Sequence, residues 1–299
     1  QSLTVNATAG ATTTLLFKDV AGTADAYTIN FNADNAAATV DAKNVIINGI
    51  ESVTVNSLGT TVAGNNAIEL TSNSAKSLVI TGDKAITVTF DNVGKFGSAT
   101  PADATNGLGV ATIDASAATG VITIDTANVK VAFNGLTVKT GSANDVITLA
   151  AQKATVDAGA GDDIIKVSNE GGTLTGGAGK DAFIVSAAVA TGATEATSVL
   201  TTITAVDAGD TIKLVTGGTF NKTVVDVSLA TNIDGAINAA LAVANTANET
   251  AWFQYAGNTY VVQNDSTEAA ATANDIIVKI NGLVDLTNST LTGADLVIA

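Results

Sequence analysis

The chain has 299 residues, with 13 Lys and Arg against 28 Asp and Glu, and it contains no His, Cys or Met. Without His or Cys it cannot build a Ser-His-Asp triad, a Cys-His pair, an imidazole or thiolate zinc site, or a disulfide. The net charge of −15 opposes binding to nucleic acid, which depends on Lys and Arg to neutralise phosphates. We therefore expect a protein that is not an enzyme and does not bind nucleic acid.

The apolar residues are mostly aliphatic, because hydrophobic content is 46% and aromatic content only 4%. Charged residues make up 14%, against about 25% in typical proteins, so Thr, Asn, Ser and Gly must cover the surface. No apolar run approaches the roughly 18 residues of a transmembrane helix, and we expect no membrane insertion. The first residue is Gln1, which predicts a processed product or a piece of a longer protein.

From Ser2 to about Lys139 the sequence alternates apolar and polar residues with a period of two, as in Ile86–Phe90. This pattern, broken by Gly, Asn, Asp and Ser, is typical of short strands and turns. Residues 44–55 resemble residues 77–88, which favours a repeating fold. The sequence therefore predicts an all-β fold, with residues 1–97 as a β-solenoid or sandwich. Residues 98–139 would continue the β rungs after a loop that contains the only proline, Pro101.

Residues 140–184 follow a different, nine-residue period. Asp145, Asp163 and Asp181 are each 18 residues apart, and an apolar residue follows each of them two positions later. In a parallel β-roll each nine-residue unit is a half-turn, so residues 18 apart stack on one edge. The stretch from Gly176 to Ile184 matches the calcium-binding nonapeptide G-G-x-G-x-D-x-U-x at every fixed position.

Stacked carboxylates repel one another unless a cation lies between them, and Ca²⁺ accepts six to eight carboxylate and carbonyl oxygens. Glycines in such turns let backbone carbonyls point inward. We predict one Ca²⁺ between the Asp145 and Asp163 turns and another between the Asp163 and Asp181 turns. The candidate metal-site residues are Asp145, Asp163, Asp181, Gly159, Gly161, Gly177, Gly179, Asp162, Ala160 and Asn144.

Residues 185–299 are predicted to form a small C-terminal β subdomain with one short helix. Apolar residues recur at helical spacing over residues 231–248, with Thr231 or Asn232 as the N-cap. The segments 252–255 and 259–262 flank Ala256-Gly257-Asn258, a pattern that indicates a β-hairpin.

The 140–184 segment resembles the RTX (repeats-in-toxin) calcium-binding repeats of proteins exported by type I secretion. Residues 203–214 look like the strand and turn that follow such a roll. The end of the chain, 294–299, resembles the acidic-then-hydrophobic secretion signals of these exports. The overall composition and the segment 112–120 are similar to crystalline surface-layer (S-layer) proteins of Gram-negative bacteria.

This resemblance implies a secreted, extracellular structural protein of a bacterial cell-surface layer. It would fold and self-assemble in a Ca²⁺-dependent way, with copies of itself as partners and a cell-surface polysaccharide as a further candidate partner. The alternative is a secreted, calcium-dependent adhesin or carbohydrate-binding module. For that function Trp252, Tyr255 and Tyr260 would be the candidate aromatic platform, although we expect them to lie in the core.

Overall fold

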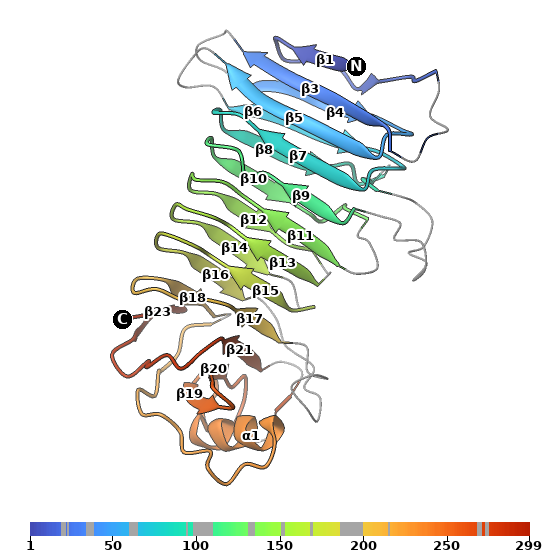
Figure 1. Ribbon diagram of the computed structural model, residues 1–299. Coiled ribbons are helices and arrows are strands. Elements are labelled where there is room, and N and C mark those ends of the chain that lie inside the picture. Colours follow the sequence, from blue (N-terminus) through green and yellow to red (C-terminus); the bar gives the residue numbers. More distant parts are fainter. Residues whose placement is uncertain are drawn as a thin grey trace. The chain divides into compact units, whose positions relative to one another are not determined.

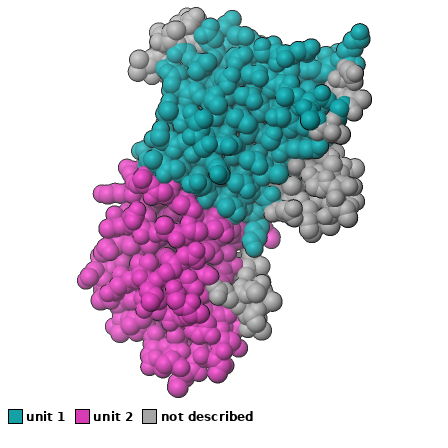
Figure 2. Space-filling view, in the orientation of Figure 1, with its two compact units in different colours: residues 1–161 teal, residues 162–299 magenta. Residues whose placement is uncertain are grey.

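The computed structural model describes residues 1–18, 22, 24–33, 39–59, 65–93, 95–97, 110–130, 135–150, 153–167, 170–185, 200–214, 216–267, 271–272 and 275–299. It forms two compact units, unit 1 (residues 1–161) and unit 2 (residues 162–299), which are coloured separately in Figure 2. The predicted loop around Pro101 lies outside the described residues. The predicted boundaries at residues 97, 139 and 184 stay predictions.

Unit 1 is built from short strands that alternate along the chain between two sheets (Figure 1). They are β1 (Ser2–Val5), β2 (Thr13–Thr14), β3 (Ala26–Ala33), β4 (Val40–Ile46), β5 (Ser52–Gly59), β6 (Asn66–Thr71), β7 (Ser77–Thr81), β8 (Ile86–Phe90), β9 (Thr112–Asp114), β10 (Ile122–Asp125), β11 (Leu136–Lys139), β12 (Val146–Thr148) and β13 (Ala154–Asp157). The odd-numbered strands follow one another in one sheet and the even-numbered strands in the other. The paired neighbours in unit 1 run parallel.

The period of two in the sequence explains why these strands pack as two layers. Along β5 every second residue is buried, and Val53 and Val55 are fully enclosed. These two residues lie opposite Leu78 and Ile80 on β7, which are also buried, so aliphatic side chains form continuous columns between the sheets. Parallel pairing between every second strand confirms the predicted β-solenoid and excludes the sandwich for this unit.

Unit 2 contains further solenoid strands and an antiparallel extension. Its strands are β14 (Ile164–Val167), β15 (Gly172–Thr175), β16 (Ala182–Val185), β17 (Thr201–Ile203), β18 (Thr211–Lys213), β19 (Thr250–Tyr255), β20 (Asn258–Gln263), β21 (Ile276–Ile280), β22 (Thr290–Thr292) and β23 (Asp295–Val297). Strands β14, β16 and β18 pair in parallel, as do β15, β17 and β21. Antiparallel β20 and β19 continue from β21, and antiparallel β23 and β22 continue from β18.

The helix of unit 2, α1 (Ile233–Val243), begins where the sequence predicts it. Asn232 is its N-cap, and the Asn232 side chain accepts a hydrogen bond from the Gly235 N–H at 2.8 Å. The helix ends five residues before the predicted Asn248. Ala244 has left the helical conformation, and the Asn264 side chain donates a 2.7 Å hydrogen bond to the Ala244 carbonyl. This bond gives the Ala244 carbonyl the donor that a further helical turn would otherwise have to supply.

The predicted hairpin is confirmed as β19 and β20, joined at Ala256 and Gly257, which both have positive φ. Trp252 and Tyr260 are buried in the core, as expected. The Tyr260 ring stacks on Phe253 at 5.0 Å, and the Trp252 indole donates a hydrogen bond to the Lys222 carbonyl. Within the described residues, no helix has the length and apolar character needed to cross a membrane.

Candidate metal centre

Four buried aspartates stand directly before four of the even-numbered strands. Asp145 precedes β12, Asp163 precedes β14, Asp181 precedes β16 and Asp210 precedes β18. All four are at most 2% exposed, although Asp is a residue that seldom lies fully buried without a partner. Three of them are the aspartates predicted from the nine-residue period. Asp210 was not among the predicted site residues.

In the earlier rungs of unit 1, the first backbone N–H of a strand bonds to a backbone carbonyl of the next rung. The Asn66 N–H donates to the Ala85 carbonyl, and the Ile86 N–H donates to the Val121 carbonyl, both at 2.8 Å. In each pair the acceptor is the residue just before the strand that follows. This is ordinary ladder bonding in a parallel sheet.

Asp145 changes this pattern, because its carboxylate takes the place of that carbonyl. The Ile122 N–H donates to Oδ1 of Asp145 at 2.7 Å. In unit 2 the Asp163 N–H donates to Oδ1 of Asp181 at 2.9 Å, and the Asp181 N–H donates to Oδ1 of Asp210 at 2.8 Å. We name the three residues of unit 2, Asp163, Asp181 and Asp210, the aspartate column. Within it, the carboxylate of one rung accepts a ladder bond, which is a hydrogen bond from a backbone N–H of the rung before.

The turn glycines of unit 1 allow a close approach between successive turns. Gly159 and Gly161 have φ values of +97° and +118°. A Cβ atom on Gly159 would lie 2.2 Å from the Gly141 carbonyl oxygen, and one on Gly161 would lie 2.5 Å from that of Ala143. The Ala160 N–H also donates to the Gly141 carbonyl at 3.0 Å. Only glycine meets both the conformational and the steric requirement here.

The corresponding turn of unit 2 contains Gly177 and Gly179, with φ values of +110° and +140°. The carboxylate of Asp181 lies in this turn. The second oxygen of this carboxylate, Oδ2, has no hydrogen-bond partner within the described residues. A Cβ atom on Gly176 would lie 2.1 Å from this oxygen, so the turn encloses a carboxylate oxygen where any larger residue would collide.

The surroundings of these buried aspartates are unfavourable to charge. Burial is the largest cause that raises the pKa of Asp181, and the nearby carboxylates of Asp210, Asp162 and Asp207 raise it further. Burial likewise raises the pKa of Asp145 and of Asp210, against the hydrogen bonds that these two carboxylates accept from backbone N–H groups. A buried carboxylate among others of the same sign is stabilised by a cation.

The other predicted site residues lie around these turns. Asp162 and Asn144 are exposed, and Oδ1 of Asp162 accepts a 2.8 Å hydrogen bond from the Lys180 N–H. Ala160 and Gly177 are half-buried, and Gly179 is exposed. Asp145, in unit 1, and Asp163, in unit 2, belong to different units, so their predicted direct stacking stays a prediction.

The predicted site residues offer the carboxylate and carbonyl oxygens that a hard cation prefers, but they do not form a complete carboxylate cage. Among the residues that the structure describes, no three of the His, Cys, Asp and Glu type gather closely enough to hold a metal ion. A Ca²⁺ at these turns would therefore have to draw ligands from backbone carbonyls or water as well as from carboxylates, which Ca²⁺ commonly does. Comparisons with protein-family models and with curated proteins find no match for this chain.

A signal for Asp210 was present in the sequence. The stretch Asp210-Thr211-Ile212-Lys213-Leu214 repeats the pattern of residues 163–167, with Asp before an apolar-alternating strand and Lys in the same place. The separation of 29 positions between Asp181 and Asp210 hid this match, because it breaks the spacing of 18 that identified the first three aspartates.

Proposed function

We propose that this chain is a structural protein of a bacterial cell-surface layer, which folds and assembles in a Ca²⁺-dependent way after secretion. The observation that carries the proposal is Asp181, whose carboxylate is 1% exposed and has an oxygen without a hydrogen-bond partner within the described residues. Three neighbouring carboxylates disfavour its charge. Without a cation, the folded state therefore carries an electrostatic cost that the extended chain avoids.

Asp145, Asp163 and Asp181, with the carbonyls of their glycine-rich turns, would hold Ca²⁺. The bound ion supplies positive charge that offsets the buried carboxylates. An ion that binds only the folded chain stabilises it, by about 2.7 kcal/mol at a hundred times its dissociation constant. Free Ca²⁺ is scarce inside cells and abundant outside them, so this linkage disfavours folding before export and favours it afterwards.

Self-assembly is supported by an ordered, uncharged column of side chains on the odd-numbered sheet of unit 1. Asn30, Asn56 and Thr81 form one column across β3, β5 and β7. The Asn56 side chain donates to Asn30 and accepts from Thr81, both at 2.6 Å. Such a hydrogen-bonded column fixes uncharged side chains in a regular array, which suits repeated packing between identical copies. The resemblance of the composition to surface-layer proteins points the same way.

Electron microscopy of the purified protein, with millimolar Ca²⁺ or with a chelator, tests the proposal. We expect ordered sheets or filaments with Ca²⁺ and dispersed chains after chelation. Mg²⁺ at the same concentration is the control, because its strict octahedral geometry and tightly held water suit a flexible carbonyl site poorly. Ordered assemblies that persist in chelator would contradict the proposal, as would failure to assemble at any Ca²⁺ concentration.

The alternative, a secreted calcium-dependent adhesin or carbohydrate-binding module, gains no support from the aromatic cluster. Trp252 and Tyr260 are at most 2% exposed, and Tyr255 is half-buried. A sugar ring therefore cannot stack on the first two. We also propose that the chain has no catalytic activity, since it contains no His or Cys to supply a nucleophile-base pair.

A further inference from the structure

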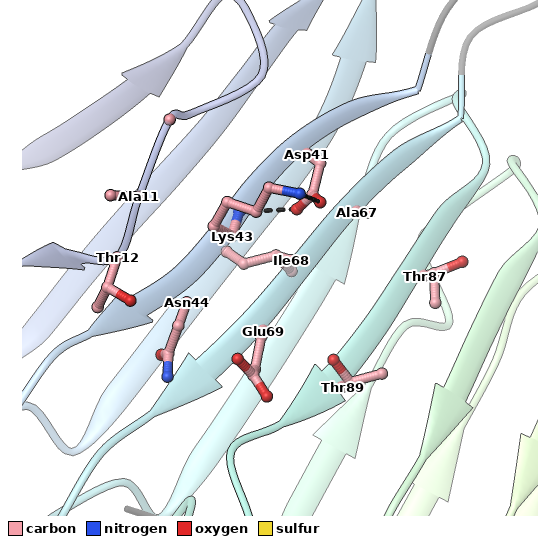
Figure 3. A pocket seen from close by; sticks show the side chains of 11 residues that line it. Ala11, Thr12, Asp41, Lys43, Asn44, Ala67, Ile68, Glu69, Thr87 and Thr89 are labelled. Carbon is pink, nitrogen blue, oxygen red and sulfur yellow. Dashed lines mark hydrogen bonds and ion pairs between the residues drawn. The ribbon is translucent and has the colours of Figure 1, made fainter.

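A groove lies on the outer face of the even-numbered sheet of unit 1, across β4, β6 and β8 (Figure 3). Its volume is about 470 Å³, within the roughly 300–1,000 Å³ typical of small-molecule sites. One lip is the segment 10–12, and the opposite side is formed by β4 and its neighbours. No residue of the aspartate column lines it.

An irregularity in β4 shapes this groove. The pairing of β4 with β6 shifts between Asp41 and Asn44, where β4 contains one residue more than its partner. Lys43, inside this bulge, has a φ of +56°, a left-handed conformation that costs a non-glycine residue about 1 kcal/mol. Bulges of this kind redirect side chains and often lie next to binding sites.

Asp41 holds Lys43 in this conformation through two contacts. The Lys43 N–H donates to Oδ1 of Asp41 at 2.7 Å, and the Lys43 ammonium pairs with Oδ2 at 2.5 Å. Asp41 is itself fixed to the residues that precede the 10–12 lip, because its N–H donates to the Thr8 hydroxyl and its carbonyl accepts from the Ala9 N–H. The ammonium and the carboxylate are thus arranged at the rim before any ligand arrives.

The groove also contains Glu69, a half-buried carboxylate with no hydrogen-bond donor within the described residues. Burial raises the pKa of Glu69, and the charges of Asp91 and Asp41 raise it further. Next to it Asn44 uses its amide oxygen to accept a 2.9 Å hydrogen bond from the Thr71 hydroxyl, which leaves its NH₂ group as a donor. Figure 3 shows Glu69 between Asn44 and the hydroxyls of Thr87 and Thr89.

From this arrangement we infer that the groove binds a neutral, hydroxyl-rich saccharide. Sugar hydroxyls both donate and accept, so they match a surface on which Glu69 and Asp41 accept while Lys43 donates. The surplus of negative charge disfavours an acidic sugar. A hydrophobic ligand is disfavoured because Ile68 is the only large apolar residue among those that line the groove.

Titration of the ¹⁵N-labelled protein with neutral oligosaccharides, followed by NMR, tests this inference. We expect saturable shifts at the amides of residues 41–44, 67–69 and 87–89. Acidic oligosaccharides of the same length should bind at least tenfold more weakly. The variant Glu69→Gln should lose at least tenfold in affinity, because it replaces a charged acceptor with a neutral amide. Glu170→Gln, an exposed glutamate that does not line the groove, is the matched control and should bind like the natural chain.

Three results would overturn the inference: no saturable shift with any neutral oligosaccharide, stronger binding of acidic ones, or equal binding by Glu69→Gln. The inference does not rest on the proposed calcium-dependent assembly. Circular dichroism of Glu69→Gln with and without Ca²⁺ separates the two, since this variant should keep the Ca²⁺ response of the natural chain. Failure of sugar binding with an intact Ca²⁺ response therefore refutes the groove alone.

Discussion

The backbone N–H of Asp163 donates a 2.9 Å hydrogen bond to the side chain of Asp181, one solenoid turn of 18 residues later. Strand pairing sets this distance, since Ile164 lies opposite Ala182 directly after the two aspartates. The spacing that suggested a metal site thus also has a structural role. Asp181 accepts this ladder bond through Oδ1, and its Oδ2 has no hydrogen-bond partner within the described residues, so the two roles can be separated by mutation.

Removal of the Asp181 side chain tests the ladder role. In Asp181→Ala the Asp163 N–H loses its acceptor, and a buried unsatisfied donor costs about 1–3 kcal/mol. We expect the free energy of unfolding to fall by about this amount in chelator, measured by urea denaturation. The exposed Asp162→Ala is the control, with a smaller loss. Equal losses in the two variants would contradict the ladder role.

Removal of the Asp181 charge alone tests the cation role. Asp181→Asn keeps an oxygen that can accept the ladder bond but carries no charge. Because burial and neighbouring carboxylates raise the pKa of Asp181, we expect this variant to be at least as stable as the natural chain in chelator. Its stabilisation by Ca²⁺ should nevertheless be smaller. Calorimetric titration with Ca²⁺ measures this, and unchanged affinity would exclude Asp181 as a ligand.

Acidification of the chelated protein should stabilise it above about pH 4. The pKa values of Asp145, Asp181 and Asp210 are raised above their ordinary 3.8, chiefly by burial, so the folded state binds protons more tightly than the unfolded state. The free energy of unfolding then rises as the pH falls through the raised pKa values, and this gain levels off below 3.8.

Asp114 affects the free energy of unfolding in the opposite direction, because a hydrogen bond from the Ser116 hydroxyl lowers its pKa. The stability that Asp114 contributes is lost only as the pH falls below 3.8. Urea midpoints in chelator from pH 7 to pH 4 measure the balance. Stability that falls steadily over this range would show that these carboxylates are not destabilised in the folded state.

The glycine turns should tolerate no side chain. Gly161→Ala would place a Cβ 2.5 Å from the Ala143 carbonyl oxygen at a φ of +118°, and we expect a loss of about 2 kcal/mol or more. Gly10→Ala is the matched control, since nothing lies within 4 Å of its Cβ position, and it should change stability by less than about 0.5 kcal/mol. Similar urea midpoints for the two variants would argue against the close stacking of the turns.

Fluorescence of Trp252, the single tryptophan, distinguishes the two candidate sugar sites. Trp252 is 2% exposed and hydrogen-bonded to the Lys222 carbonyl. We therefore expect little acrylamide quenching and no change in emission when oligosaccharides are added. A sugar-dependent shift in emission would instead favour the aromatic cluster as a binding platform.

The solenoid could be predicted because alternation such as Ile86–Phe90 depends only on which face of a strand is buried. The proximity of Asp163 and Asp181 could be predicted because the solenoid turn between them has the regular length of 18 residues. Other features depend on partners distant in sequence. The early end of α1 depends on Asn264, and the bulge at Lys43 depends on how β4 meets β6. The groove around Glu69 therefore had no local signal.

Circular dichroism during Ca²⁺ titration of the chelated protein tests the central claim most directly. We expect partial β-sheet signal in chelator, from a marginally stable folded population, and a cooperative gain of β-sheet signal as Ca²⁺ is added. The gain should require much more Ca²⁺ in the variant that combines Asp145→Asn, Asp163→Asn and Asp181→Asn. Identical spectra of the natural chain with and without Ca²⁺ would contradict calcium-dependent folding.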